Sequence, residues 1–164
     1  MSSGTGVIWI HSTPSALCPH IEWAVGGVLG VPVNFEWTPQ PADRSQRAEY
    51  AWRGPTGSAA AISSALSRWG RVRFEVTEEA SADAEGERYA YTPSLGVFRA
   101  TTGEFGDVMV HEDRIKAAML EDAAGGEPLR VALDKLLGRP WDDELEAFRH
   151  AGEDAPVRWL HKVV

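Results

Sequence analysis

The spacing of apolar and polar residues predicts four strands in the first half of the chain. An apolar run at residues 7–11 predicts a buried strand. Apolar side chains alternate with polar ones over residues 31–38 and 46–53, which predicts two half-buried strands. The same alternation over residues 71–77 predicts a fourth strand, with Glu75 and its neighbouring arginines on the outward face.

Two amphipathic helices are predicted between these strands. Apolar residues recur at helical spacing over residues 21–29, and this helix begins either at residues 12–14 or at Pro19. Gly30 is a typical residue for its C-terminal end. A second helix is predicted over residues 56–69, with a hydroxyl cap at its first residue.

The resulting order is βαββαβ, which is typical of a ferredoxin-like fold of the α+β class. In that fold, an antiparallel sheet has both helices on one face. The other face must therefore be covered by another part of the chain or bind a partner. We expect residues 1–78 to form this core.

The second half of the chain predicts a β-hairpin and a helical extension. The expected elements are strands at 88–92, 95–101 and 108–110, helices at 112–124 and 129–137, a last helix that Asp142 caps and that runs toward residue 150, and a tail at 156–164 that packs as a strand or as an extended arm. We expect one domain over residues 1–164, in which residues 88–164 pack on the core.

Composition limits the classes of partner and the compartment. The chain has 164 residues, a net charge of −8 and a single cysteine. An acidic chain has no long-range attraction to nucleic acid or to an anionic membrane, and one cysteine permits no internal disulfide. No leader peptide and no apolar stretch of about 18 residues is visible, so the cytoplasm is the expected location.

The first strand-to-helix turn holds the residues best suited to catalysis, which are His11, Cys18 and His20. A thiol beside a helix start can have a lowered pKa and act as a nucleophile, with either imidazole as its base. The alternative is that Cys18 is a small core residue and that the histidines make local hydrogen bonds.

We expect neither a metal nor a cofactor. His11, Cys18 and His20 are suitable ligand types, but the chain lacks a second pair at metal-binding spacing. No glycine-rich phosphate loop is present either, because the Gly26-Gly27 pair falls inside the first predicted helix.

Several arginine and tryptophan residues could form an interaction surface, because both residue types are enriched at binding hot spots. These residues are Arg53, Arg71, Arg73, Arg88, Trp141 and Trp159. The alternative is that the arginines pair with nearby glutamates and that the tryptophans belong to the core.

Several motifs together are similar to one known family. They are His11-Ser12 and the sequences at residues 16–30, 37–41, 138–145 and 156–161. The chain resembles the actinobacterial family called domain of unknown function 3145, and the resemblance covers essentially the whole chain. The resemblance implies no established activity, cofactor or catalytic residue. It does imply a link to fatty-acid synthesis, because the family's genes often lie near genes of that pathway.

Two functional hypotheses follow. The first is a non-catalytic binding or regulatory module, whose partner is a protein or a small ligand and which we associate with an acyl-carrier or another fatty-acid synthesis component. The second is a small thiol-dependent enzyme or thioester-handling protein that uses Cys18 with His11 or His20. We favour the module, because the sequence holds no complete catalytic signature.

Overall fold

The computed structural model describes residues 2–150, which form a mixed α/β architecture around one antiparallel sheet. The sheet has seven strands in the order β2-β3-β1-β4-β5-β6-β7. The strands are β1 (Ser3–Thr13), β2 (Thr38–Pro39), β3 (Gln46–Pro55), β4 (Arg73–Glu78), β5 (Gly86–Thr92), β6 (Gly96–Thr102) and β7 (Val108–Met109). The helices are a 3-10 turn, η1 (Ser15–Leu17), and α1 (Cys18–Leu29), α2 (Ser58–Ser67), α3 (Glu112–Ala123), α4 (Leu129–Leu136) and α5 (Arg139–Arg149). The sheet is larger than the predicted four-stranded core, because the hairpin β5–β6 and β7 extend it.

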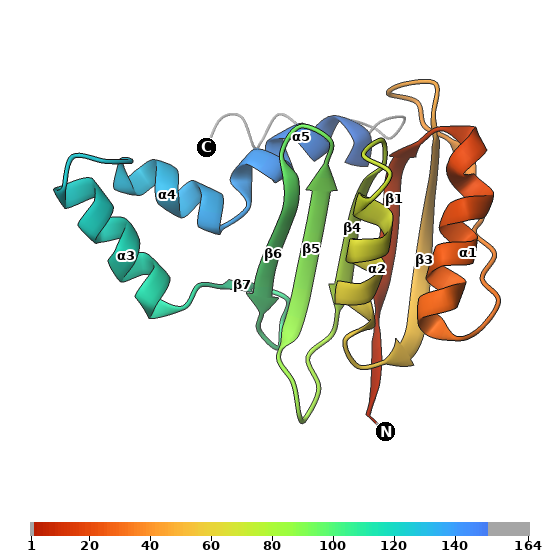
Figure 1. Cartoon of the computed structure of the whole chain (residues 1–164), viewed down its shortest axis with the longest axis horizontal. Helices are drawn as coiled ribbons and strands as arrows, with labels where there is room; N and C mark the ends of the chain where they lie inside the picture. The colour runs from red at the N-terminus through yellow and green to blue at the C-terminus, as the bar shows by residue number, and fades with distance from the viewer. Residues whose placement is uncertain (1, 151–164) are drawn as a thin grey trace.

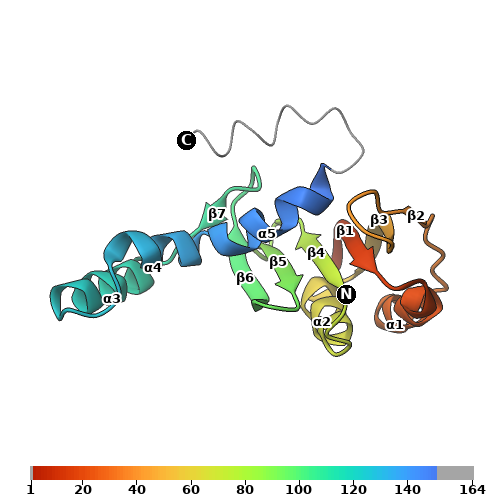
Figure 2. The ribbon, with the colours of Figure 1, turned by 90° about the horizontal axis from the view of Figure 1, so that it is seen from above.

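Helices α1 and α2 cover one face of the sheet, and α5 crosses the opposite face (Figure 2). The main core lies between the sheet and the first two helices, where Ile8, Phe74 and Ile62 are fully buried. Strand alternation explains this arrangement, because Ile8 and Val76 are register partners that point to the same face. The residues next to Ile8 on β1 and next to Val76 on β4 point to the other face of the sheet, which holds the candidate site. We call it the open face.

The predicted strand over residues 31–38 is wrong for most of its length. Only Thr38–Pro39 pair with β3, although Val33 and Phe35 are buried as the alternation predicted. The backbone N–H of Phe35 donates to the Glu22 carboxylate at 2.7 Å, so this segment bonds to α1 where a strand would bond to the sheet. Side-chain periodicity therefore predicted burial correctly and hydrogen bonding incorrectly.

The starts of the first two helices depend on different residues. Helix α1 begins at Cys18, with Pro19 in its first turn, and Gly30 ends it at φ 75° as predicted. Helix α2 begins at Ser58 without a side-chain cap from its own segment. The buried Glu78 carboxylate instead accepts the N–H groups of Gly57 and Ala59 at 3.0 and 3.1 Å. This negative charge stabilises the positive end of α2 from the neighbouring strand β4.

The C-terminal helices differ in how they meet the sheet. Helix α5 begins at Arg139, directly after Gly138, so the predicted cap at Asp142 is wrong: that carboxylate lies within the helix and forms ion pairs. Leu145 of α5 is fully buried against Ala90 and Phe98 of the open face. Helices α3 and α4 project sideways past the β7 edge of the sheet (Figure 1).

Candidate functional site

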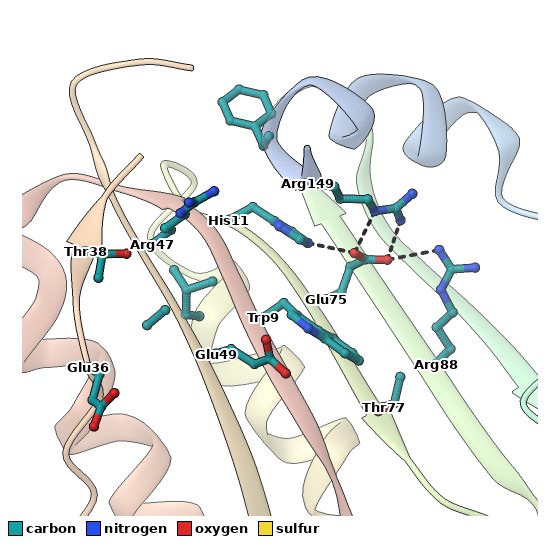
Figure 3. Close-up of a pocket in the computed structure, with 13 residues that line it drawn as sticks. Trp9, His11, Glu36, Thr38, Arg47, Glu49, Glu75, Thr77, Arg88 and Arg149 are labelled. Atoms are coloured by element: carbon teal, nitrogen blue, oxygen red, sulfur yellow. Dashed lines mark hydrogen bonds and ion pairs between the residues drawn. The ribbon is translucent and has the colours of Figure 1, made fainter. Parts of the chain in front are cut away.

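The part of the open face that α5 leaves uncovered contains a cavity of about 690 Å³. Strands β1, β3 and β4 form its floor, and the last turn of α5 forms one wall (Figure 3). Its lining includes aromatic, carboxylate, guanidinium and hydroxyl side chains. They are Trp9, Ile10, His11, Glu36, Thr38, Arg47, Ala48, Glu49, Glu75, Thr77, Arg88, Phe148 and Arg149.

The strand register places the floor residues in one row. Trp9 on β1 lies directly opposite Glu49 on β3 and Glu75 on β4. The row continues through Ala90 on β5 to Phe98 on β6, where α5 covers it. The half of the row that stays open is therefore an indole between two carboxylates.

Glu75 is the centre of a buried ion-pair network. Its carboxylate accepts hydrogen bonds from His11 Nε2 at 2.7 Å, from Arg88 at 3.0 Å, and from Arg149 at 2.5 and 3.0 Å. Arg88 and Arg149 also share Asp142 Oδ1, at 2.7 and 2.9 Å. Two carboxylates thus balance two guanidinium groups, and the imidazole of His11 completes the cluster.

Burial alone would raise the pKa of Glu75, but the hydrogen bonds and charges of His11 and Arg149 outweigh it and hold that pKa well below its usual range. Burial likewise acts to lower the pKa of Arg149, and its bonds to Glu75 and Asp142 reverse the effect and raise it. Both side chains therefore stay charged. Glu75 acts as a fixed hydrogen-bond acceptor, because it holds no proton that it could donate to a substrate near neutral pH.

Polar contacts beside the network fix the end of α5 on the sheet. Gln40, which is buried, donates through Nε2 to the carbonyl oxygens of His11 at 2.6 Å and Phe148 at 3.2 Å. The Arg73 guanidinium lies over the Phe148 ring, 4.6 Å from its centroid. The cavity wall is therefore attached to β1 and β4 through several independent contacts.

The predicted arginine surface is divided between internal and exposed positions. Arg73 and Arg88 contact α5, as described above, while Arg53 on β3 and Arg71 just before β4 are exposed. Strand alternation places Arg53, Arg73 and Arg88 on the open face. Because two of the four arginines hold α5, the set does not form one free basic surface.

Trp141 and Trp159 were the two tryptophans proposed for an interaction surface, and the structure describes only the first of them. Trp141 packs its ring against Phe98, with centroids 5.1 Å apart, and its Nε1 donates to the Gly96 carbonyl oxygen at 2.9 Å. It anchors α5 to β6 within the molecule. Trp159 lies outside the residues that the structure describes.

The residues of the nominated thiol site lie in different surroundings. Cys18 is buried at the start of α1, and burial together with the nearby Glu22 charge raises the pKa of its thiol. His11 bonds to Glu75 on the open face, while His20 is exposed on α1. Within residues 2–150 we find no hydrogen bond between Cys18 and either imidazole, and a raised pKa is the opposite of thiolate activation.

The described residues contain neither a cluster of metal ligands nor a membrane-spanning helix. Residues 2–150 contain no group of three or more His, Cys, Asp or Glu side chains placed to hold a metal ion. In the same part of the chain, every helix is too short or too polar to cross a membrane.

Sequence reasoning missed most of the cavity. The outward position of Glu75 on a central strand was a usable signal, because a carboxylate there needs partners from another element. Its partner Arg149 carried no such signal, since the two residues are 74 positions apart. Trp9 and Glu49 were expected only as parts of a strand and not as a pair.

The fold and the site define a mixed α/β protein with a polar, aromatic-floored cavity on one face of its sheet. The chain belongs to the family described as "Protein of unknown function (DUF3145)", whose model matches residues 7–162. Comparison with curated proteins and with solved structures gave no match.

Proposed function

We propose that this protein is a non-catalytic binding or regulatory module of the cytoplasm that holds its ligand in the cavity between β3, β1 and the end of α5. The observation that carries the proposal is the row Glu49–Trp9–Glu75, in which the inner carboxylate is fully paired and the outer one is exposed. We further propose that residues 1–78 adopt a ferredoxin-like arrangement and that the hairpin and the helical extension complete a single domain around it.

The paired half of the site supports a binding role. Glu75 is saturated by His11, Arg88 and Arg149, and its lowered pKa leaves its carboxylate with no proton to give to a substrate near neutral pH. A satisfied network of this kind makes the floor rigid, and a rigid floor lowers the entropy lost when a ligand binds.

The open half of the site indicates the chemistry of the ligand. Glu36 and Glu49 are exposed, and neither forms an ion pair within residues 2–150. Trp9 presents an aromatic surface beside Glu49 (Figure 3). An aromatic face next to carboxylates attracts a cationic group through cation–π and Coulomb interactions. The ligand is therefore a molecule that carries a basic group beside an apolar group, such as a lysine- or arginine-bearing segment of a partner protein.

The thiol-enzyme alternative has less support, because Cys18 has a raised pKa and, within residues 2–150, no imidazole is hydrogen-bonded to it. The link to an acyl-carrier or another fatty-acid synthesis component remains a prediction from the family resemblance. The cavity favours a basic segment of such a component, since the free charges at its rim are carboxylates.

A pair of blocked peptides tests the ligand chemistry. Leu-Arg-Phe and Leu-Glu-Phe, each acetylated and amidated, are titrated into the ¹⁵N-labelled full chain. We expect amide shifts at Trp9 and Glu49 with the arginine peptide and none with the glutamate peptide.

Charge-reversed variants provide the control. Glu49→Lys should weaken binding of the arginine peptide by at least about tenfold, because it replaces an attraction with a repulsion. Glu104→Lys makes the same charge change in the exposed β6–β7 loop and should leave binding unchanged. Equal binding of both peptides, or equal effects of the two variants, would refute the proposal. Mass spectrometry of proteins that wild type captures and Glu49→Lys loses then identifies the partner.

A further inference from the structure

Helices α3 and α4 form an arm, residues 112–137, that has little core of its own. The arm projects away from the sheet in both views (Figures 1 and 2). Within it, α3 buries only Ala118 and α4 buries no residue. Helices of 12 and 8 residues are marginal in water without tertiary packing. The arm therefore has an apolar face in excess of what the described residues cover.

The uncovered apolar face belongs mainly to α3. Leu120 is 72% exposed and Met119 is 53% exposed, whereas Ala118 is buried. Ala117 and Ala124 stand three positions before and four positions after Leu120, so all three lie along one stripe of the helix. Alanines beside a leucine let a second helix approach closely, as in ridges-into-grooves packing.

One pair of charges beside this stripe is self-complementary. Arg114 and Glu121 are seven positions apart, so they lie on the same flank of the stripe. When a second α3 runs antiparallel, Leu120 packs against Ala117 of the other copy. Arg114 then faces Glu121 of the other copy, and the two-fold axis generates each contact twice.

We propose that α3 is a homodimer interface through which two copies of this chain pair antiparallel, with Leu120 at the centre and Arg114–Glu121 pairs at the flank. A second copy is the occupant because one helix supplies both members of each complementary pair in the order that two-fold symmetry requires. Each whole chain carries a net charge of −8, and the projecting arm keeps the rest of the two chains apart, which reduces their mutual repulsion. Two short helices bury less than the roughly 1,000 Å² of a stable interface, so the dimer is weak and concentration-dependent.

Sedimentation velocity of the full chain tests this proposal. The mass should rise from 17.9 kDa toward twice that value as the protein concentration increases from about 1 to about 300 µM. Leu120→Glu and Arg114→Glu should each raise the dissociation constant by at least about tenfold, because they place like charges or an unpaired carboxylate at the interface. Far-UV circular dichroism checks that each variant keeps its helices.

A charge swap separates the proposed pairing from a general effect of charge. The double variant Arg114→Glu with Glu121→Arg reverses both partners and should restore the wild-type dissociation constant. Arg130→Glu makes the same charge change at an exposed position of α4 and should have no effect. Three results would each overturn the proposal. The first is a monomer at every protein concentration, and the second is a double variant that dimerises as weakly as Arg114→Glu alone. The third is an Arg130→Glu variant whose dissociation constant rises as much as that of Arg114→Glu.

Discussion

Glu75 and Arg149 form a two-point ion pair, at 2.5 and 3.0 Å, between the middle of the sheet and the last turn of α5. They are separated by 74 positions in the sequence. The pair joins strand β4 to the C-terminal helix α5 and sets the position of the cavity wall. Breaking it should therefore affect the stability of the fold and the shape of the site together.

Arg149→Ala should lower the free energy of unfolding by about 3 kcal/mol, because it leaves a buried carboxylate with one guanidinium partner fewer. Arg99→Ala is the matched control, since it removes the ion pair to Glu87 from a side chain that is 63% exposed. That change should cost less than about 1 kcal/mol. Urea denaturation of the two variants and wild type measures both values, and similar losses would contradict the assigned role of the network.

The pH dependence of stability should identify Glu75. The pKa of Glu75 in the folded protein lies well below its reference value of 4.5. As the pH falls below 4.5, Glu75 therefore takes up a proton in the unfolded chain and stays ionised in the folded chain. The stability that Glu75 contributes is therefore fully present above pH 4.5 and is lost as the pH falls below it.

Glu75→Gln removes this linkage. The slope of unfolding free energy against pH between about pH 4.5 and 3 should be smaller in the variant by up to about 1.4 kcal/mol per pH unit. Glu104→Gln, which alters an exposed carboxylate outside the network, provides the comparison. An unchanged slope in Glu75→Gln would show that Glu75 titrates alike in the folded and unfolded chains.

The elements of the fold were largely predictable because they follow local patterns. Helix α3 was expected at 112–124 and spans Glu112–Ala123, and the hairpin formed at its expected position. Residues 31–37 departed from the prediction because a side chain from α1, Glu22, bonds to their backbone. The alternation of apolar residues predicts which side chains are buried. It does not predict which hydrogen-bond partners the backbone N–H and C=O groups have.

The site was less predictable because tertiary contacts assemble it. Asp142 has the residue type of a helix cap, but ion pairs with Arg88 and Arg149 determine its role. Trp141 was a candidate either for an interaction surface or for the core, and in the structure it fixes α5 on β6. Nothing in the local sequence of these residues specifies which strand they meet, since that depends on the path of the whole chain.

Cys18 should react slowly in the folded protein. Its side chain is buried and its pKa is raised, so both access to the sulfur and the thiolate population are low. Intact mass after iodoacetamide treatment should show little modification in buffer and complete modification in urea. Rapid modification of the native protein would revive the thiol-enzyme hypothesis, and Cys18→Ala would then test whether the thiol is needed for activity.

Two glycine-to-alanine changes should have opposite effects on stability. A Cβ at Gly6 would lie 1.8 Å from the Thr77 carbonyl oxygen and 2.7 Å from Trp52 Nε1, the two atoms that hydrogen-bond to each other at 3.1 Å. Gly6→Ala must therefore push apart β1 and β4 or break that bond, and it should cost about 3 kcal/mol.

Gly27 lies inside α1, and a Cβ there would meet no atom within 4 Å. Gly27→Ala should stabilise the protein by up to about 1 kcal/mol, because alanine favours the helix. Thermal and urea unfolding measure both variants, and a tolerated Gly6→Ala would mean that β1 and β4 are not packed as closely as the register requires.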